Sequence, residues 1–432
     1  MSQGSGLPWD QEKLPGGLPL IWQQRTGPDI VAARLWIRGG SSGDPLGQRG
    51  AHQLLAGLLS RGCGSLDADA LADLVEGCGA VLRAEALEDS LVLSLKCATA
   101  DAAELVPLLL TMVRSPWLSP DQLSLEQQLN LQSLQRQQED PFQLAHDQIR
   151  ARLYGDGPYG HDPLGIEADL ASLDQHQLKP LAAALGEQGA LLVLTGTIQN
   201  ELRQRLRERL IQEPWPCQMP AATVGPGATG NGGFGHQEQD TEQLVLMLGC
   251  ATVALGHPDG VALRLLQTHL GLGMSSRLFV VMREERGLAY DVGVHLPARR
   301  GAAPFIWHLS SSIERAAEAC AAAMEEWQRM LETPLTTAEL ALAKAKYLGQ
   351  EAMGRQTCGQ IADRQALVLG HGLPATTIED CLAQAQQLTA PDLLGAAQRW
   401  LAKPAMGVCG PAKALQGAER VWQTHAIPHQ KT

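Results

Sequence analysis

A single histidine stands near the start of a glycine-led apolar segment, QRGAHQLLAGLLSRGCG, at residues 48–64. In the pattern H-x-x-E-H, two histidines one helical turn apart bind zinc, and the glutamate between them activates a water molecule. Here His52 fills the first position, but Leu55 stands at the glutamate position and Ala56 at the second histidine position. A catalytic zinc needs three protein ligands and an open coordination site, so one imidazole cannot hold it.

A second pattern, GGSSG, matches the G-x-S-x-G sequence of a hydrolase nucleophile elbow and makes Ser41 a candidate nucleophile. That elbow requires a strand, a sharp turn and then a helix at once. After this pattern the chain continues as DPLGQRG, which contains a proline and two more glycines before any helix begins. We therefore interpret this stretch as a polar loop between a strand and a helix.

Two histidine groups elsewhere are candidate metal ligands. His425 and His429 are four residues apart, but Pro428 makes a continuous helix there improbable. His161 and Asp162 lie in a glycine-rich stretch with no obvious third ligand. Isolated histidines are more often packed or solvated than metal-bound, so the sequence predicts no zinc site in this chain.

The stretch SSRLFVVMREERGLAY predicts a helix from about Ser275 that stops at Gly287, followed by a strand that begins at Ala289. This places Arg283 near the helix end and Tyr290 at the strand start, close enough to project towards one place. Two interpretations are open from the residues alone. The arginine caps helix carbonyls and the tyrosine fills a half-buried sheet position, or the two side chains form a functional pair.

Composition sets the broad class of the protein. With 432 residues, 44% hydrophobic and 19% charged, the chain has material for two or more globular domains. A net charge of -12 without a basic cluster argues against nucleic acid as a partner. The N-terminal sequence lacks a signal-peptide pattern and no stretch has the length of a membrane span, so we expect a cytoplasmic protein and no membrane partner. Nine cysteines, spread singly without a C-x-x-C pair, indicate reduced thiols.

An internal repeat predicts the domain organisation. Residues 214–240 are rich in Pro, Gly and Ala and predict an exposed linker between an N-terminal domain, 1–213, and a C-terminal domain, 241–432. On each side the same order appears: a strand (DIVAARLWIRGG or EQLVLMLGCATV), a loop, then an apolar helix. Each half also closes on a short apolar strand ending in glycine, ALLVLTGTI or AMGVCGP.

The first half contains a clear hairpin pattern, AVLRAEALEDSLVLSLKCAT. Alternation places Leu91, Leu93, Leu95 and Cys97 on one face of its second strand. Helical spacing in ADAAELVPLLLTMVRS and ERAAEACAAAMEEWQRML predicts helices that cover such faces. We therefore expect an α+β fold, with two homologous domains that each consist of a mostly antiparallel sheet covered by helices.

The glutamine-rich segment LSLEQQLNLQSLQRQQEDP predicts a solvated helix. Its leucines, Leu125, Leu129 and Leu131, are expected to form its one buried stripe.

Several motifs together resemble the pitrilysin-type family of inverted zinc metallopeptidases, which includes insulin-degrading enzyme and the mitochondrial processing peptidases. The resemblance covers nearly the whole chain, and its most specific part is SSRLFVVMREERGLAY. The segments that carry it are G-x-x-H at 49–52, EDP at 139–141, PYGHDPLG at 158–165, LLVLTGTI at 191–198, SSRLFVVMREERGLAY at 275–290 and LTTAELALAKAKYL at 335–348.

The resemblance implies that two α/β halves form one side of a peptidase clamshell, and that two such sides close around an unfolded peptide. One side of an active member carries H-x-x-E-H and a distal glutamate ligand. Of these four positions only His52 matches. Leu55 stands at the glutamate position, Ala56 stands at the second histidine position, and Gln132 and Ser133 lie near the position of the distal glutamate. The helix after residue 49 thus resembles a zinc helix that has kept its packing and lost its chemistry.

The resemblance also implies an Arg and a Tyr contributed from the side that faces the zinc, and Arg283 and Tyr290 match these positions. A guanidinium can bind substrate backbone carbonyls, and a phenol can donate to the developing oxyanion. The expected function is the non-zinc subunit of a heterodimeric metallopeptidase, inactive alone, whose zinc is held by a homologous partner with an intact H-x-x-E-H. The alternative is a catalytically inert structural or peptide-binding pseudopeptidase.

Overall fold

The computed structural model describes residues 8–27 and 29–425, which form two compact units. Neither unit is contiguous in sequence. Unit 1 comprises Met1–Ser133, Asp162–Thr223 and Ala352–Thr377, and unit 2 comprises Leu134–His161, Val224–Glu351 and Ile378–Thr432. The contiguous division at 214–240 that the sequence suggested therefore does not coincide with these units.

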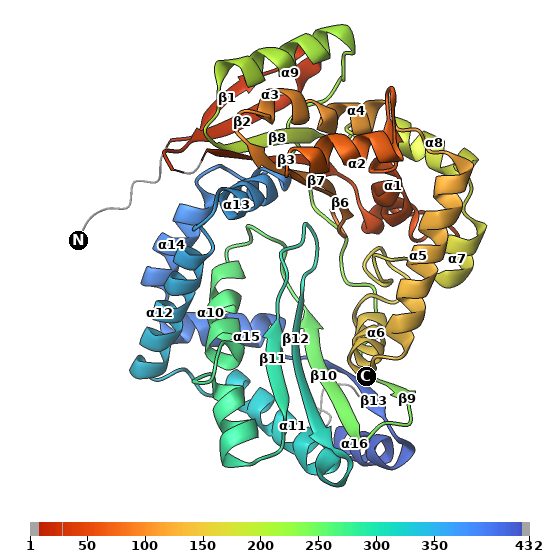
Figure 1. The fold of residues 1–432 in the computed structure, drawn as a ribbon. Helices are drawn as coiled ribbons and strands as arrows, with labels where there is room; N and C mark the ends of the chain where they lie inside the picture. The colour runs from red at the N-terminus through yellow and green to blue at the C-terminus, as the bar shows by residue number, and fades with distance from the viewer. Residues whose placement is uncertain (1–7, 28, 426–432) are drawn as a thin grey trace. The chain divides into compact units, whose positions relative to one another are not determined.

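Unit 1 is built on a six-stranded sheet with β3 inside it, between β8 and β7 (Figure 1). All neighbouring strands are antiparallel except β2 and β8. Residues 31–38 of β3 are buried without interruption because helices cover both faces of this central strand. In sheet order the strands are β1 (Asp10–Lys13), β2 (Pro19–Gln24), β8 (Ala190–Gly196), β3 (Ile30–Arg38), β7 (Ser90–Ala98) and β6 (Val81–Ala86).

Unit 2 repeats this pairing with five strands. Its first strand in sequence, β9, runs parallel to its last, β13, as β2 runs parallel to β8 in unit 1, and the other neighbours are antiparallel. The expected α+β repeat of two mostly antiparallel sheets is confirmed. In sheet order the strands are β11 (Asp291–His295), β12 (Pro304–Ser312), β10 (Gln243–Ala251), β13 (Ala405–Gly410) and β9 (Phe234–Glu238).

The predicted hairpin is also confirmed, since β6 and β7 pair antiparallel across the short turn between them. Leu91, Leu93, Leu95 and Cys97 are all buried, as the alternation predicted. The helices that belong to unit 1 are α1 (Ala51–Leu59), α2 (Ala68–Gly77), α3 (Ala102–Leu105), α4 (Leu108–Arg114), α7 (Glu167–Ser172), α8 (Gln175–Ala183), α9 (Asn200–Gln212) and α13 (Cys358–Gly370).

The large core of unit 2 lies on the face of its sheet that carries Leu244, Leu246 and Leu248 of β10. The predicted helix ERAAEACAAAMEEWQRML forms there as α11 and packs on β10 and β12. The helices of this unit are α6 (Pro141–Tyr154), α10 (Gly260–Gly271), α11 (Ala316–Glu332), α15 (Ala390–Trp400) and α16 (Ala412–His425), while α5 (Pro120–Gln138), α12 (Thr337–Met353) and α14 (Thr377–Gln387) extend across the unit boundaries.

The second face of each sheet is covered by a helix from the other half of the sequence. In unit 1, Ala362, Ala366 and Leu369 of α13 pack on residues such as Trp36 of β3. In unit 2, α6 packs on β13 and β10, and a Cβ at Gly407 would lie 2.5 Å from the backbone nitrogen of Ile149 in α6. This exchange of helices explains why the units are discontinuous in sequence.

The expected linker is wrong in two respects. Its last part forms β9, and the coil before β9, although largely exposed, is anchored in unit 1 by the buried residues Trp215 and Pro220. Trp215 is 1% exposed, and its Nε1 donates to the carbonyl of Leu185 at 3.0 Å. Arg38 donates to the carbonyl of Ala221 at 2.5 Å and to Oγ1 of Thr223 at 3.2 Å. Residues 214–223 are therefore an integral part of unit 1.

The buried stripe predicted for α5 is also wrong, because Leu125 and Leu129 are each 40% exposed. The helix buries Glu126 instead, whose Oε1 accepts from Nε of Arg61 at 2.7 Å. An ion pair at this helix contact replaces the leucine stripe, and a polar residue of this kind is invisible to a search for apolar periodicity.

Within residues 8–27 and 29–425, no helix combines the length and the apolar character needed to cross a membrane.

Candidate functional site

His52 lies in the first turn of α1, and its side chain is buried. Its Nδ1 is 2.6 Å from Oδ1 of Asp44, whose carboxylate also accepts from the backbone N–H groups of Gly50 and His52 at 2.8 and 3.1 Å. The first N–H groups of a helix have no partners within the helix, so a carboxylate is favourable at this end. One ring nitrogen of His52 is thus engaged in a buried His–Asp pair.

The other positions of the zinc pattern carry no metal ligands. Leu55 and Ala56 are both 0% exposed and offer only carbon atoms. Gln132 is exposed, and the hydroxyl of Ser133 donates to the carbonyl of Leu129 at 2.9 Å. The donor atoms of this chain therefore do not fit the three-ligand zinc site of an active peptidase.

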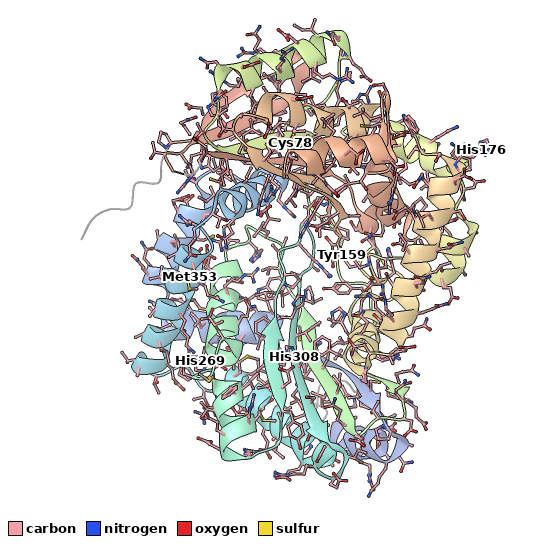
Figure 2. All side chains as sticks on the ribbon, in the orientation of Figure 1. Cys78, Tyr159, His176, His269, His308 and Met353 are labelled. Atoms are coloured by element: carbon pink, nitrogen blue, oxygen red, sulfur yellow. The ribbon has the colours of Figure 1, made fainter. Side chains whose placement is uncertain are left out.

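The remaining histidines lie on separate elements, as Figure 2 shows for His176 on α8, His269 on α10 and His308 on β12. His425 ends α16, where its Nδ1 lies 3.1 Å from the carbonyl of Val421, and His429 lies outside the described residues. In the described chain, no three or more His, Cys, Asp or Glu side chains come together in an arrangement that would hold a metal ion.

The two loop candidates have local roles. Ser41 is 1% exposed and belongs to a short 3-10 turn, Ser41–Gly43, which is separated from α1 by seven further residues, 44–50. The strand, turn and immediate helix of a nucleophile elbow are therefore not formed. His161 is buried, and Oδ1 of Asp162 accepts from the N–H of Leu164 at 2.9 Å within a turn.

The segment that carries Arg283 and Tyr290 has a less regular structure than the sequence suggested. It contains a π-helix over Phe279–Glu285, and β11 begins one residue after Tyr290. Gly287 has a φ of 59°, a left-handed conformation that lets the chain reverse between the helix and the strand. The segment rests on unit 2 through an apolar inner side formed by Leu278, Val281, Met282, Leu288 and Ala289.

Both candidate side chains are on the surface of unit 2. Arg283 is exposed with its guanidinium carbon 4.9 Å from the centre of the Phe279 ring, and Tyr290 is 70% exposed. Within the part of the chain that the structure describes, neither the guanidinium of Arg283 nor the hydroxyl of Tyr290 has a hydrogen bond or ion pair. Their donors are therefore available to a ligand.

The purely structural interpretation of this pair does not match the geometry. Arg283 does not cap the end of the helix, because the carbonyls of Arg286 and Gly287 accept from Arg315 instead. Tyr290 does not fill a half-buried sheet position, since most of its surface is exposed.

A group of aromatic and imidazole side chains lies on unit 2 where β11 begins. Nε2 of His308 is 3.4 Å from Oδ2 of Asp291, and the His308 ring contacts Phe142 of α6 edge-on, with ring centres 5.1 Å apart. Burial lowers the pKa of His308, and the Asp291 carboxylate opposes this shift. Burial, with a smaller contribution from Arg150, lowers the pKa of His146 to about 3. Burial therefore favours the neutral form of both imidazoles. The sequence did not reveal the group because α6, β11 and β12 bring it together.

Comparison with known proteins identifies two family segments in this chain. Residues 20–165 match the family model described as insulinase, peptidase family M16, and residues 218–347 match the one described as the peptidase M16 inactive domain. The chain belongs to peptidase family M16. The suspected pitrilysin-type family is thereby confirmed for a chain that lacks the zinc motif.

M16 relatives cover nearly the whole chain. An uncharacterized zinc protease of Mycobacterium tuberculosis is 24% identical over 398 residues, 90% of each protein. The non-peptidase homolog YmxG of Helicobacter pylori is 22% identical over 396 residues, 89% of each protein. The second family model and the Helicobacter relative fit an M16 chain that is itself inactive.

Solved structures support the same fold. The crystal structure of a peptidase M16 inactive domain from Pseudomonas fluorescens superposes with a TM-score of 0.85 at 25% identity, covering 94% of this chain and 98% of that one. A protease from Helicobacter pylori shares the fold with a TM-score of 0.82 at 18% identity, covering 94% of this chain and all of that one.

Proposed function

We propose that this chain is the non-zinc subunit of a two-chain M16 metallopeptidase that acts on unfolded peptides. Arg283 binds backbone carbonyls of the peptide, and Tyr290 donates a hydrogen bond to the oxyanion that develops during cleavage. The partner is a homologous chain with an intact H-x-x-E-H, which supplies the zinc. Heterodimer formation and a cytoplasmic location are parts of this proposal.

One observation carries the proposal: Arg283 and Tyr290 have unused donors on a segment whose neighbouring arginines are engaged. Arg277 and Arg286 of the segment, and Arg315 beside it, each pair with a glutamate of α11. A side chain that served only folding would be expected to have such a partner or to be buried. Exposed, unpaired donors on an otherwise well-anchored segment fit a role in ligand binding.

The second candidate is an inert M16 chain with a structural or peptide-binding role. It is supported by Leu55 and Ala56, whose side chains offer no atom that could bind zinc, and by the likeness to a protein named a non-peptidase homolog. This candidate predicts no dependence of any peptidase activity on Arg283 or Tyr290.

Reconstitution tests the proposal directly. The purified chain is assayed on a quenched unfolded peptide alone, with a homologous chain that carries H-x-x-E-H, and with that mixture after chelation. We expect activity only in the unchelated mixture, and Arg283→Ala should raise the KM of that mixture because it removes a charged donor to the substrate backbone. A partner chain that is equally active without this chain would contradict the proposal.

A further inference from the structure

The chain leaves the π-helix that carries Arg283 through irregular backbone hydrogen bonds before it reaches Tyr290. The N–H of Arg286 reaches back five residues to the carbonyl of Val281 at 3.1 Å, and the next donors, Leu288 and Ala289, share the carbonyl of Met282 at 2.7 and 3.2 Å. Single-turn π-helices are rare and occur frequently at functional sites. Residues 283–287 are all exposed, so packing does not hold this turn from outside.

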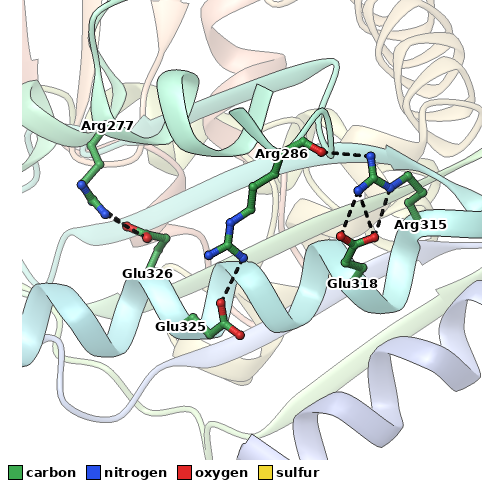
Figure 3. Close-up of polar contacts among 6 residues, drawn as sticks. All are labelled: Arg277, Arg286, Arg315, Glu318, Glu325 and Glu326. Carbon is green, nitrogen blue, oxygen red and sulfur yellow. Dashed lines mark hydrogen bonds and ion pairs between the residues drawn. The ribbon is translucent and has the colours of Figure 1, made fainter. Parts of the chain in front are cut away.

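Helix α11 holds the beginning of the segment. Nε and Nη2 of Arg277 donate to the two carboxylate oxygens of Glu326 at 2.6 and 2.9 Å, and the Glu326 side chain is 7% exposed (Figure 3). A bidentate arginine–carboxylate pair fixes geometry in two directions. The chain therefore enters the π-helix at a defined place.

Arg315 holds the end of the segment. Its Nη1 donates to the carbonyl of Arg286 at 2.9 Å (Figure 3). The same Nη1 donates to the carbonyl of Gly287 at 3.0 Å, at the point where the chain reverses. The other side of the guanidinium, Nε and Nη2, is held by both carboxylate oxygens of Glu318 at 2.9–3.1 Å. A planar guanidinium can bind a carboxylate and two carbonyls at once, whereas a lysine ammonium has no such fork.

A third contact joins Arg286 to Glu325 at 3.0 Å. Three glutamates of α11 make these contacts. Glu325 and Glu326 follow Glu318 by seven and eight residues, about two helical turns, so all three lie along one side of the helix. One helix thus fixes both ends of the segment between which Arg283 lies.

We propose that Arg315 is a positioning residue for Tyr290. By binding the carbonyls of two consecutive residues, Arg286 and Gly287, Arg315 fixes the reversal that sets where Tyr290 lies relative to Arg283. This inference rests on the proposed function, because positioning matters only if Tyr290 acts on a substrate. Arg315 itself touches no substrate in this scheme.

Arg315 is a suitable target because its side chain is 39% exposed and forms no part of the core, so its loss should leave the fold intact. The variants Arg315→Ala, Arg315→Lys and Tyr290→Phe are compared with wild type. Arg420→Ala serves as the matched control, since Arg420 is an exposed arginine of α16 whose Nε donates to the carbonyl of Gln416 at 3.2 Å.

Two readouts are measured on the same proteins. Hydrogen–deuterium exchange of residues 286–290 in the full chain reports whether Arg315 holds the chain reversal, and it needs no activity. Turnover of the reconstituted complex, well below its melting temperature, reports positioning. In Arg315→Ala, we expect faster exchange and a kcat lowered about tenfold with KM within about twofold, since a misplacement of about 1 Å can cost on the order of a hundredfold in rate. Arg315→Lys should recover part of the kcat, and Arg420→Ala should match wild type.

Each other outcome is decisive. Unchanged exchange in Arg315→Ala shows that Arg315 does not hold the chain reversal, and overturns the inference. Faster exchange with unchanged kcat, while Tyr290→Phe lowers kcat, overturns positioning and leaves the proposed function standing. If Tyr290→Phe also leaves kcat unchanged, the proposed function fails and this inference fails with it.

Discussion

The buried pair of His52 and Asp44 gives a quantitative prediction about the degenerate zinc helix. His52→Ala removes the ring nitrogen that lies 2.6 Å from Asp44, while Asp44 keeps its backbone donors from Gly50 and His52. A hydrogen bond to a charged group contributes about 1.5–3 kcal/mol. The side chain of Asp44 is 0% exposed, so the substitution leaves a buried carboxylate with one fewer donor. We therefore expect a loss of about 2–3 kcal/mol in the free energy of unfolding.

This loss corresponds to a fall of about 4–12 °C in melting temperature for domains of roughly 150–250 residues. The assay is a thermal melt of wild type and His52→Ala, each with and without EDTA. We expect EDTA to change neither melting temperature, because Leu55 and Ala56 leave His52 without fellow ligands. His425→Ala, at the exposed end of α16, is the control and should change little.

One result would refute this reasoning. If EDTA lowered the melting temperature of wild type as far as His52→Ala does, and had no further effect on the variant, His52 would be a metal ligand. The His–Asp pair would then not account for its burial.

Two further predictions concern the linker and the dependence on pH. Trp215→Ala should destabilise unit 1 by about 3–5 kcal/mol, as large-to-small changes at buried tryptophans do. The control Val224→Ala should have no effect, because Val224 is fully exposed. Equal urea unfolding midpoints for wild type and Trp215→Ala would show that Trp215 does not anchor the coil. The Asp259 carboxylate accepts from Arg399 and from the indole of Trp400, and the Arg399 hydrogen bond is the main cause that lowers its pKa below the ordinary 3.8. A lowered pKa stabilises the fold above the ordinary pKa, and the contribution is lost as pH falls through the folded value. The stability difference between wild type and Asp259→Asn should therefore be largest at neutral pH and shrink below about pH 4, and a difference that grows on acidification would contradict this assignment.

Local sequence patterns predict much of the fold. Alternation in LVLSLKC was enough to predict the buried face of β7, and the recurrence of strand, loop and helix was enough to predict two similar sheets. These predictions succeeded because burial on one side of a strand imposes a period that a single sequence displays. The segment from Ser275 to Tyr290 was the most specific part of the family resemblance, and the matches to family M16 confirmed that resemblance.

The contacts that a sequence does not show are those between distant segments. The coverage of each sheet by α6 or α13 from the opposite half depends on which surface a helix meets, and helical periodicity carries no such information. The coil around Trp215 was mistaken for an exposed linker because its Pro and Gly content conceals one deeply buried indole. The Arg315 contacts were missed because a charged residue at a helix start usually indicates a solvated surface.

The most direct test of the central claim is the turnover of the reconstituted complex with Tyr290→Phe in this chain. Tyr290 is 70% exposed and its hydroxyl has no partner among the described residues, so the substitution should leave folding and pairing unchanged. Removal of one oxyanion donor typically costs about 3 kcal/mol, on the order of a hundredfold in rate. The account predicts a large fall in kcat with an unchanged melting temperature and unchanged affinity between the subunits. Wild-type kcat in the Tyr290→Phe complex would contradict it.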